Sequence, residues 1–215
     1  MEVTSGEYNS DIQTWNEVIL TYSAALKQVN TKLEILNDEF QLVHQYNPIE
    51  HIKSRLKTAE SIVKKLKKYG RESSIENMVT YVNDIAGIRI ICSFTDDIYE
   101  IAQMIAKQSD IKVIEVKDYI QNPKPSGYMS YHMLVSIPVY LSDKIVETKV
   151  EIQIRTVAMD FWASLEHKIN YKFEGNVPED IRSELVACAQ MVSILDNRML
   201  LLNKEVQKLG AEGLI

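Results

Sequence analysis

The residues best suited to chemistry lie in one stretch, residues 149–156, with the sequence KVEIQIRT. Val150, Ile152 and Ile154 alternate with polar residues, a period of two that predicts a β-strand. The polar positions are Lys149, Glu151, Gln153 and Arg155. They place an anion, an amide and a cation at steps of roughly 7 Å along one face, which suits a site for a metal ion and phosphates. An edge strand with a solvated polar face would show the same pattern.

A second feature is a basic segment between residues 53 and 68 of an otherwise acidic chain, whose net charge is -6. Its cations are Lys53, Arg55, Lys57, Lys64, Lys65, Lys67 and Lys68. The acidic balance argues against a general nucleic-acid binder, while a local basic surface suggests a small polyanionic ligand. For the stretch from Lys64 to Lys68, a solvated helix face is the simpler explanation.

Two carboxylates accompany these cations: Asp84 just before the first predicted strand and Glu151 on the polar face of strand 149–156. The sequence has neither GxxxxGK[ST] nor GxGxxG. Carboxylates and cations in this setting suggest metal-assisted phosphoryl-type transfer on a scaffold without a P-loop. Tyr128, which follows Ser126-Gly127, could stack on a base or simply fill the sheet. Lys124 sits in the rigid turn PKPSG and is expected to point outward.

Helical periodicity dominates the N-terminal third of the chain. An unbroken 3-4 spacing of apolar residues predicts a long amphipathic helix with the stripe Ile12, Trp15, Ile19, Tyr22, Leu26, Val29, Leu33, Leu36, Phe40 and Val43. Pro48 is expected to begin a second helix, up to a left-handed cap at Gly70. Its predicted stripe is Ile49, Ile52, Leu56, Ala59, Val63 and Leu66. Lys53, Lys57 and Ser61 would share one face of that helix, about 200° from Arg55 at 3.6 residues per turn.

Strands and helices then mix along the rest of the chain, which predicts an α/β or α+β core. We expect strands over 88–94, 111–116, 128–138 and 149–156, and helices over 75–82, after an Asp96-Asp97 N-cap, over 157–171, and after Pro178. The inward positions of helix 157–171 are predicted to be Ala158, Phe161, Trp162, Leu165 and Ile169. Its polar face carries Asp160 and His167, of which His167 could be a ligand or an ordinary surface histidine.

The whole-chain composition is that of one soluble globular domain, since 215 residues with 46% hydrophobic and 25% charged side chains can bury one sizeable core. Two distant cysteines, Cys92 and Cys188, suggest neither a disulfide framework nor a cysteine zinc site, and a reducing cytoplasm fits them. The sequence shows no secretory signal pattern and no apolar run approaching the eighteen or so residues of a membrane span. We therefore expect a cytoplasmic protein without a membrane segment.

Four ordered motifs resemble the RelA/SpoT synthetase family, and the chain looks like one of its stand-alone small alarmone synthetases from Gram-positive bacteria. The motifs are SRLK at 54–57 with Ser61, DIAGIR at 84–89, SGYMSYH at 126–132, and EIQIRT at 151–156 continuing through FW at 161–162 and EH at 166–167. The resemblance covers roughly residues 47–172. No histidine-rich hydrolase domain accompanies them, so alarmone degradation is not expected.

The resemblance implies a GTP pyrophosphokinase of the stringent response. Such an enzyme transfers the β,γ-diphosphate of ATP to the ribose 3′-hydroxyl of GDP or GTP and yields AMP with ppGpp or pppGpp. The implied fold is α+β, a mixed sheet flanked by helices and similar to nucleotidyltransferases. The chain would be one synthetase domain, with a helical arm at 1–47, a catalytic core at 48–172 and a C-terminal helix at 173–215.

The resemblance also implies roles for residues around the donor, ATP, and around Mg²⁺. Arg55 and Arg89 would sandwich adenine, since guanidinium planes suit stacking. Asp84 and Glu151 would bind Mg²⁺, and Glu151 would also accept the proton of the 3′-hydroxyl. The ATP phosphates would be held by Lys57 and Ser61.

For the acceptor, GDP or GTP, the resemblance implies that Tyr128 stacks on guanine. The other implied acceptor contacts are Lys124, His132, Gln153 and Asp160. Met129 departs from the family pattern, because many members carry Arg or Gln at that position of G-Y-x-S. On the strand alternation its side chain points away from Tyr128 and His132.

Two other classes of protein remain open from the residues alone. One is a catalytically silent nucleotide-binding or helical interaction protein, and the other is a nucleotidyltransferase that moves a nucleotidyl group. The first and last helices each repeat the 3-4 spacing over at least four heptads. We therefore expect a homo-oligomer held by these helices, a tetramer by the resemblance, unless the stripes pack on the protomer's own sheet.

Overall fold

A computed structural model describes residues 5–43, 46–173 and 176–211, with side chains from residue 14 to residue 210 within those ranges. In this part of the chain a five-stranded mixed sheet has the order β1-β2-β5-β4-β3. The strands are β1 (Ile49–Leu56), β2 (Ala86–Cys92), β3 (Lys112–Asp118), β4 (Tyr131–Tyr140) and β5 (Ile145–Thr156). β5 pairs parallel with β2 and antiparallel with β4. The KVEIQIRT stretch is therefore the central strand rather than an edge.

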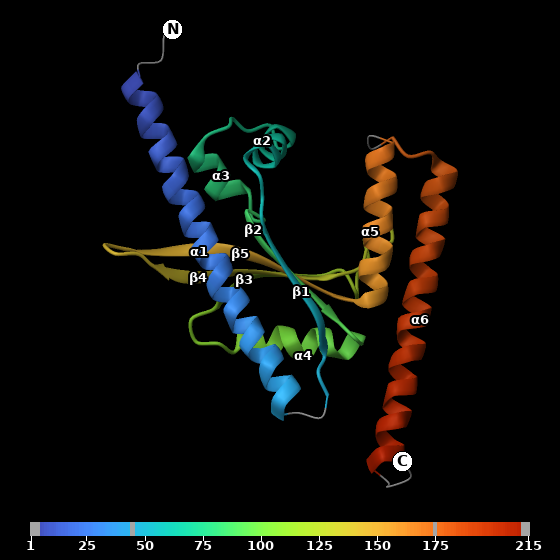
Figure 1. The fold of residues 1–215 in the computed structure, drawn as a ribbon. Coiled ribbons are helices and arrows are strands. Elements are labelled where there is room, and N and C mark those ends of the chain that lie inside the picture. The colour runs from blue at the N-terminus through green and yellow to red at the C-terminus, as the bar shows by residue number, and fades with distance from the viewer. Residues whose placement is uncertain (1–4, 44–45, 174–175, 212–215) are drawn as a thin grey trace.

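The described residues also form six helices around this sheet (Figure 1). They are α1 (Ser5–Val43), α2 (Ala59–Lys68), α3 (Ile75–Tyr81), α4 (Thr95–Ala106), α5 (Val157–Lys172) and α6 (Glu179–Ala211). α1 runs diagonally across the sheet, whereas α5 and α6 lie side by side as an antiparallel pair at the other side of the molecule. The α+β class and the mixed sheet flanked by helices are confirmed.

The hydrophobic core lies on the face of the sheet that α1 and α4 cover. Ile88 is paired with Ile152 and Ile90 with Ile154 in the β2–β5 register, and these side chains are almost completely buried. Helix α1 contributes three residues of its predicted stripe, Tyr22, Val29 and Leu33, together with Ala25, each at most 3% exposed. This part of the predicted stripe therefore packs on the protomer's own sheet, while the side chain of Ile12 lies outside the described residues.

The predicted helix from Pro48 to Gly70 is wrong in its first half, because the chain forms strand β1 there and helix α2 only from Ala59. A register shift between Ile49 and His51 adds a residue to the strand. The inward positions Ile49, Ile52 and Leu56 are consequently three and four residues apart, which imitates helical spacing. The left-handed cap at Gly70 is confirmed, with φ of 66°.

The other predicted elements agree with the structure apart from their ends. The strand expected from Tyr128 begins at Tyr131. α4 begins at Thr95, so Asp97 is not the N-cap but reaches back from the first turn and accepts the backbone N–H of Phe94 at 2.8 Å. Thr156 caps α5 by accepting the backbone N–H of Met159.

α5 and α6 bury less apolar surface than the sequence predicts. Phe161 and Leu165 are 63% and 42% exposed, so their predicted inward placement is wrong in the protomer. Trp162 is buried in that helix together with Met159 and Ala163, and its Nε1 donates to the backbone oxygen of Leu185 on α6 at 2.9 Å. Helix α6 packs against the side of α5 that carries Trp162, whereas Phe161 stays exposed.

Helix α6 is long and apolar enough, between Glu179 and Gly210, to cross a membrane by length and composition alone, which the sequence reading did not anticipate. Its polar side chains, however, tie it to the core. Asp196 accepts a hydrogen bond from Thr156 at 2.7 Å, and Lys204 forms an ion pair with Asp96 at 2.6 Å. Charged residues within a membrane span are costly, so the contacts favour a helix lying along the core.

Candidate active site

The polar face of the sheet gathers the sequence-predicted residues into rows, because strand pairing aligns positions that the sequence keeps far apart. One row crosses all five strands through Lys53, Arg89, Gln153, His132 and Lys117. The adjacent row places Arg55, Gly87 and Glu151 side by side. These residues alternate with the core positions of their strands and therefore lie on the face opposite α1 and α4.

A cavity of about 190 Å³ opens over β1, β2 and β5. It brings together five predicted residues, Arg55, Asp84, Arg89, Glu151 and Gln153. The rest of its lining is Lys53, Ser54, Gly87 and Ile88. Arg55 and Lys53 both line this cavity because residues two apart in a strand, here β1, share a face.

A second, more open cavity of about 750 Å³ carries the remaining predicted phosphate ligands. Its lining is Lys57, Ser61, Lys64, Lys65, Lys68, Tyr69 and His167. Of the lysines that the sequence suggested form a solvated helix face, Lys64, Lys65 and Lys68 therefore line a basic cavity. His167 on α5 also lines it.

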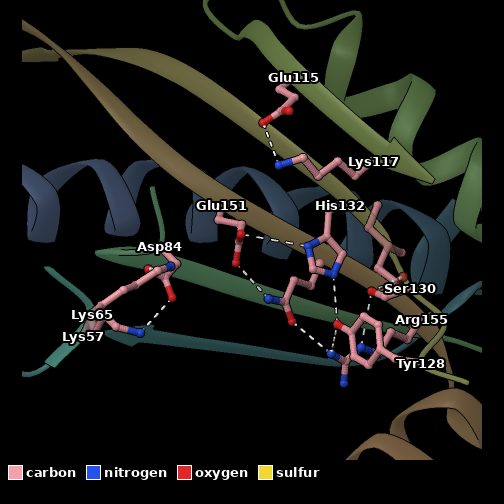
Figure 2. Close-up of polar contacts among 12 residues, drawn as sticks. Lys57, Lys65, Asp84, Glu115, Lys117, Tyr128, Ser130, His132, Glu151 and Arg155 are labelled. Carbon is pink, nitrogen blue, oxygen red and sulfur yellow. Dashed lines mark hydrogen bonds and ion pairs between the residues drawn. The ribbon is translucent and has the colours of Figure 1, made fainter. Parts of the chain in front are cut away.

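Asp84 is held by two cations (Figure 2). Lys57 Nζ lies 2.8 Å from Asp84 Oδ2, and Lys65 Nζ lies 2.8 Å from Asp84 Oδ1. Burial opposes ionisation of Asp84, but the hydrogen bonds and positive charges of the two lysines together outweigh it and lower the pKa of this carboxyl. Asp84 is therefore a carboxylate at neutral pH. Lys65 was not among the predicted site residues, although its i, i+4 relation to Ser61 on α2 was a usable signal.

Glu151 has a different environment, made of an amide and an imidazole (Figure 2). Gln153 Nε2 donates to Glu151 Oε2 at 2.8 Å, and His132 Nδ1 lies 3.9 Å from Glu151 Oε1. Within the described residues no group of three or more His, Cys, Asp or Glu side chains could hold a metal ion. Asp84 and Glu151 nevertheless border one cavity, and Mg²⁺ usually takes only one or two carboxylates plus substrate phosphates.

The acceptor-side residues meet around Tyr128. Its hydroxyl lies 2.9 Å from His132 Nε2, and Lys124 Nζ lies 4.8 Å from the centre of its ring. Burial, with the cations Arg155 and Lys124 nearby, lowers the pKa of His132 to about 3, so this imidazole is neutral. Tyr119, which no sequence motif indicated, packs edge-on against both Tyr128 and His132.

Asp160 and Arg155 join the acceptor side to the donor side. Asp160 Oδ1 accepts hydrogen bonds from Arg89 Nη1 and from Arg155 Nη1, each at 3.2 Å. Arg89 Nε is buried without a hydrogen-bond partner among the described side chains, which leaves a donor beside the smaller cavity. Met129 is 6% exposed and packs in the core, as the alternation predicts.

Comparison with known proteins gives consistent matches. A family model described as "Region found in RelA / SpoT proteins" matches residues 54–176. GTP pyrophosphokinase YwaC of Bacillus subtilis (strain 168) is 47% identical, over 91% of this chain and 93% of that protein. Small alarmone synthetase 1 from Bacillus subtilis has similar crystal structures with its product pppGpp (TM-score 0.85, 35% identity, 91% of this chain and 99% of that one) and with AMPCPP (TM-score 0.78, 33% identity, 91% and 99%).

Proposed function

Because the chain belongs to the RelA/SpoT family, we infer that it is a GTP pyrophosphokinase that makes the alarmones ppGpp and pppGpp. It transfers the β,γ-diphosphate of ATP to the 3′-hydroxyl of GDP or GTP and releases AMP. The observation that carries this conclusion is the joint placement of two carboxylates and several cations on one face of a sheet whose fold matches a synthetase with bound pppGpp. A dense polyanion moves between two nucleotides, so such a site works through positioning and electrostatic stabilisation.

We propose that ATP binds across the two cavities on the β1–β2 side of the sheet. Arg55 and Arg89 line the smaller cavity and would enclose adenine, with the unpartnered Arg89 Nε available to a polar atom of the donor. Lys57 and Ser61 line the larger cavity and would hold the phosphates. Lys65 joins them, because it already shares Asp84 with Lys57.

We propose that Asp84 and Glu151 hold Mg²⁺, which supplies charge neutralisation for the migrating diphosphate. Glu151 would also accept the proton of the acceptor 3′-hydroxyl. The 3′-oxygen then forms a bond to the β-phosphorus, the bond from that phosphorus to the oxygen bridging the α-phosphate breaks, and AMP leaves with the bridging oxygen. Gln153 supports the carboxylate through its hydrogen bond to Oε2.

The acceptor is proposed to bind on the β4 side, with guanine stacked on Tyr128. Lys124 lies over that ring and would contact the phosphates of GDP or GTP. His132, Gln153 and Asp160 complete this half of the site. Because Asp160 is shared by Arg89 and Arg155, it ties the acceptor half to the donor half.

We also propose a homo-oligomer, a tetramer, whose contacts involve the outward apolar face of α6. The exposed large apolar residues of α6 are Met191, Ile194, Leu195, Met199, Leu201, Leu202, Val206 and Leu209. The division into an N-terminal helix at 1–47, a core at 48–172 and a C-terminal helix at 173–215 within one domain is a proposal, as is a cytoplasmic location.

The function is tested by incubating the protein with labelled ATP, GDP and Mg²⁺ and separating the nucleotides. AMP with a 3′-diphosphorylated guanosine is the expected result, and chelation of Mg²⁺ by EDTA should abolish it. Release of free pyrophosphate with guanosine unmodified would point to a nucleotidyltransferase. No turnover would favour a silent nucleotide-binding protein.

A further inference from the structure

Five side chains of the acceptor half, Arg155, Gln153, Glu151, His132 and Tyr128, close a ring of contacts. Figure 2 shows Glu151, His132, Tyr128 and Arg155 beside one another on the polar face of the sheet. Arg155 Nη2 donates to Gln153 Oε1 at 3.1 Å, and Gln153 Nε2 donates to Glu151 Oε2 at 2.8 Å. Arg155 Nη2 also donates to the Tyr128 hydroxyl at 2.5 Å. Tyr128 contacts His132 at 2.9 Å, and His132 faces Glu151 at 3.9 Å.

The direction of each hydrogen bond in this ring is set by Arg155. A guanidinium only donates, so the atom of Gln153 that faces it must be the carbonyl oxygen. The amide nitrogen of Gln153 is then turned toward Glu151. The Tyr128 oxygen likewise accepts from Arg155, which leaves its own hydrogen for His132 Nε2 and places the proton of the neutral imidazole on Nδ1, facing Glu151.

Arg155 is itself fixed from outside the ring. Its side chain is 4% exposed. Nε lies 3.3 Å from the hydroxyl of the fully buried Ser130, and Nη1 lies 3.2 Å from Asp160. Its guanidinium carbon also lies 4.9 Å from the centre of the Tyr128 ring. With its donors engaged by protein groups, Arg155 has a structural reason to orient its neighbours rather than to bind a phosphate.

We propose that Arg155 is the positioning residue of the acceptor site: it orients the amide of Gln153 and the hydroxyl of Tyr128, and through them holds the Glu151 carboxylate ready to receive the 3′-hydroxyl proton. This inference rests on the proposed function of Glu151. Arginine is required because one planar group serves four partners in fixed directions, which an ammonium group cannot do.

The first test is Arg155→Lys, which keeps the positive charge but loses the planar guanidinium with its several fixed donors. We expect kcat to fall roughly 10- to 100-fold, the usual effect of removing a partner that orients a catalytic ligand. The KM for GDP should rise more than the KM for ATP, because Arg155 does not line the donor cavities and reaches Arg89 only through Asp160. Arg182→Lys, at a position 54% exposed, is the matched control and should behave as wild type.

The second test is a double-mutant cycle with Tyr128→Phe, which keeps the aromatic ring of the side chain and removes only its hydroxyl. If Arg155 acts through Tyr128, the loss in kcat caused by Tyr128→Phe should be much smaller in the Arg155→Lys background than in wild type. Equal losses in both backgrounds, or equal increases in KM for ATP and GDP, would overturn the proposal.

Folding of each variant is checked by circular dichroism and thermal melting. If Arg155→Lys does not fold, Tyr128→Phe alone still tests the proposal. It keeps the aromatic side chain but removes the hydroxyl that links Arg155 to His132, so the proposal requires kcat to fall. A wild-type kcat for Tyr128→Phe would then overturn the proposal. A wild-type protein without synthetase activity would instead contradict the proposed function.

Discussion

Asp84 and Glu151 are proposed to serve the same ion, yet their surroundings differ. Asp84 is neutralised by Lys57 and Lys65, whereas Glu151 is held by an amide and faces a neutral imidazole. When ATP enters, the two lysines can exchange the carboxylate for phosphate oxygens, because both partners are anions. The Asp84 carboxylate would then be free to bind Mg²⁺ when the phosphates are present.

We expect Asp84→Asn and Glu151→Gln to lower kcat by about a hundredfold or more, since each removes charge that acts in the transition state. Both are near-isosteric, so the thermal melting of the protein should change little. Asp110→Asn, at an exposed ion pair with Lys32, is the control. Synthesis at wild-type rate by either site variant would refute the assignment of that carboxylate.

At Tyr128 we expect substitution by Ala to weaken GDP binding by roughly 1–3 kcal/mol, the usual contribution of a base stacked on an aromatic ring. ATP binding should remain nearly intact, and calorimetric titration with each nucleotide measures both. Tyr140→Ala, at the far end of strand β4 and 69% exposed, is the control. Equal losses for both nucleotides would show that the Tyr128 ring is structural.

Sequence motifs indicated the side chains that the proposed reaction uses but not those that hold them. Arg155 lies in the same alternating set as Glu151 and Gln153, so its position was evident while its role was not. That role depends on Tyr128 and Asp160, which the fold brings to it from a loop and from helix α5. Tyr119 contacts Tyr128, His132 and Lys124 through its ring and belongs to no motif that the sequence displays.

At the scale of elements, the bulge in β1 gives a strand the apolar spacing of a helix. Apolar spacings of three and four residues satisfied the helical template, and Pro48 before them fitted a helix start. The segment forms a strand because its backbone pairs antiparallel with β2 from Leu56 to Ile49, a long-range contact that local sequence does not reveal. Strand β5 was predicted correctly because its alternation is unbroken and both of its neighbours bury the same face.

The loop that carries Tyr128 is braced by helix α6. Gly127 has φ of 87°, and a Cβ added there would lie 2.6 Å from the Cβ of Ala189 and 3.5 Å from the Trp162 ring. Glycine is therefore required twice, for its backbone angle and for its lack of a side chain. This close approach places the acceptor loop directly against the C-terminal helix.

We expect Gly127→Ala to raise the KM for GDP about tenfold or more, because the strained angle alone costs on the order of 1–3 kcal/mol. The KM for ATP should not change. Adding Ala189→Gly removes the close contact but leaves the strained angle, so the double variant should recover part of the loss. Gly210→Ala, which meets nothing within 4 Å, is the control and should leave both KM values unchanged. An unchanged KM for GDP in Gly127→Ala would contradict the bracing role of α6.

At the scale of the whole molecule, the two long helices have different roles despite their similar spacing. The middle of α1 is buried in the core, with Val29 and Leu33 only 1% exposed. α6 contacts α5 and the acceptor loop along one side and leaves a row of large apolar side chains open on the other. A contiguous exposed apolar surface of this kind usually marks a protein interface. The sequence could not distinguish the two helices, because a heptad pattern specifies a stripe and not the surface that covers it.

We expect the wild-type protein to be oligomeric in solution and Leu195→Glu with Met199→Glu to dissociate it. These positions are 52% and 48% exposed in the protomer, so two carboxylates there can be solvated once the subunits separate. Light scattering should report a smaller species, while circular dichroism shows an intact fold. Gln207→Glu on the same helix is the control for added charge. General unfolding of the double variant would mean that the stripe packs within one subunit, and a wild-type monomer at micromolar concentration would refute the oligomer.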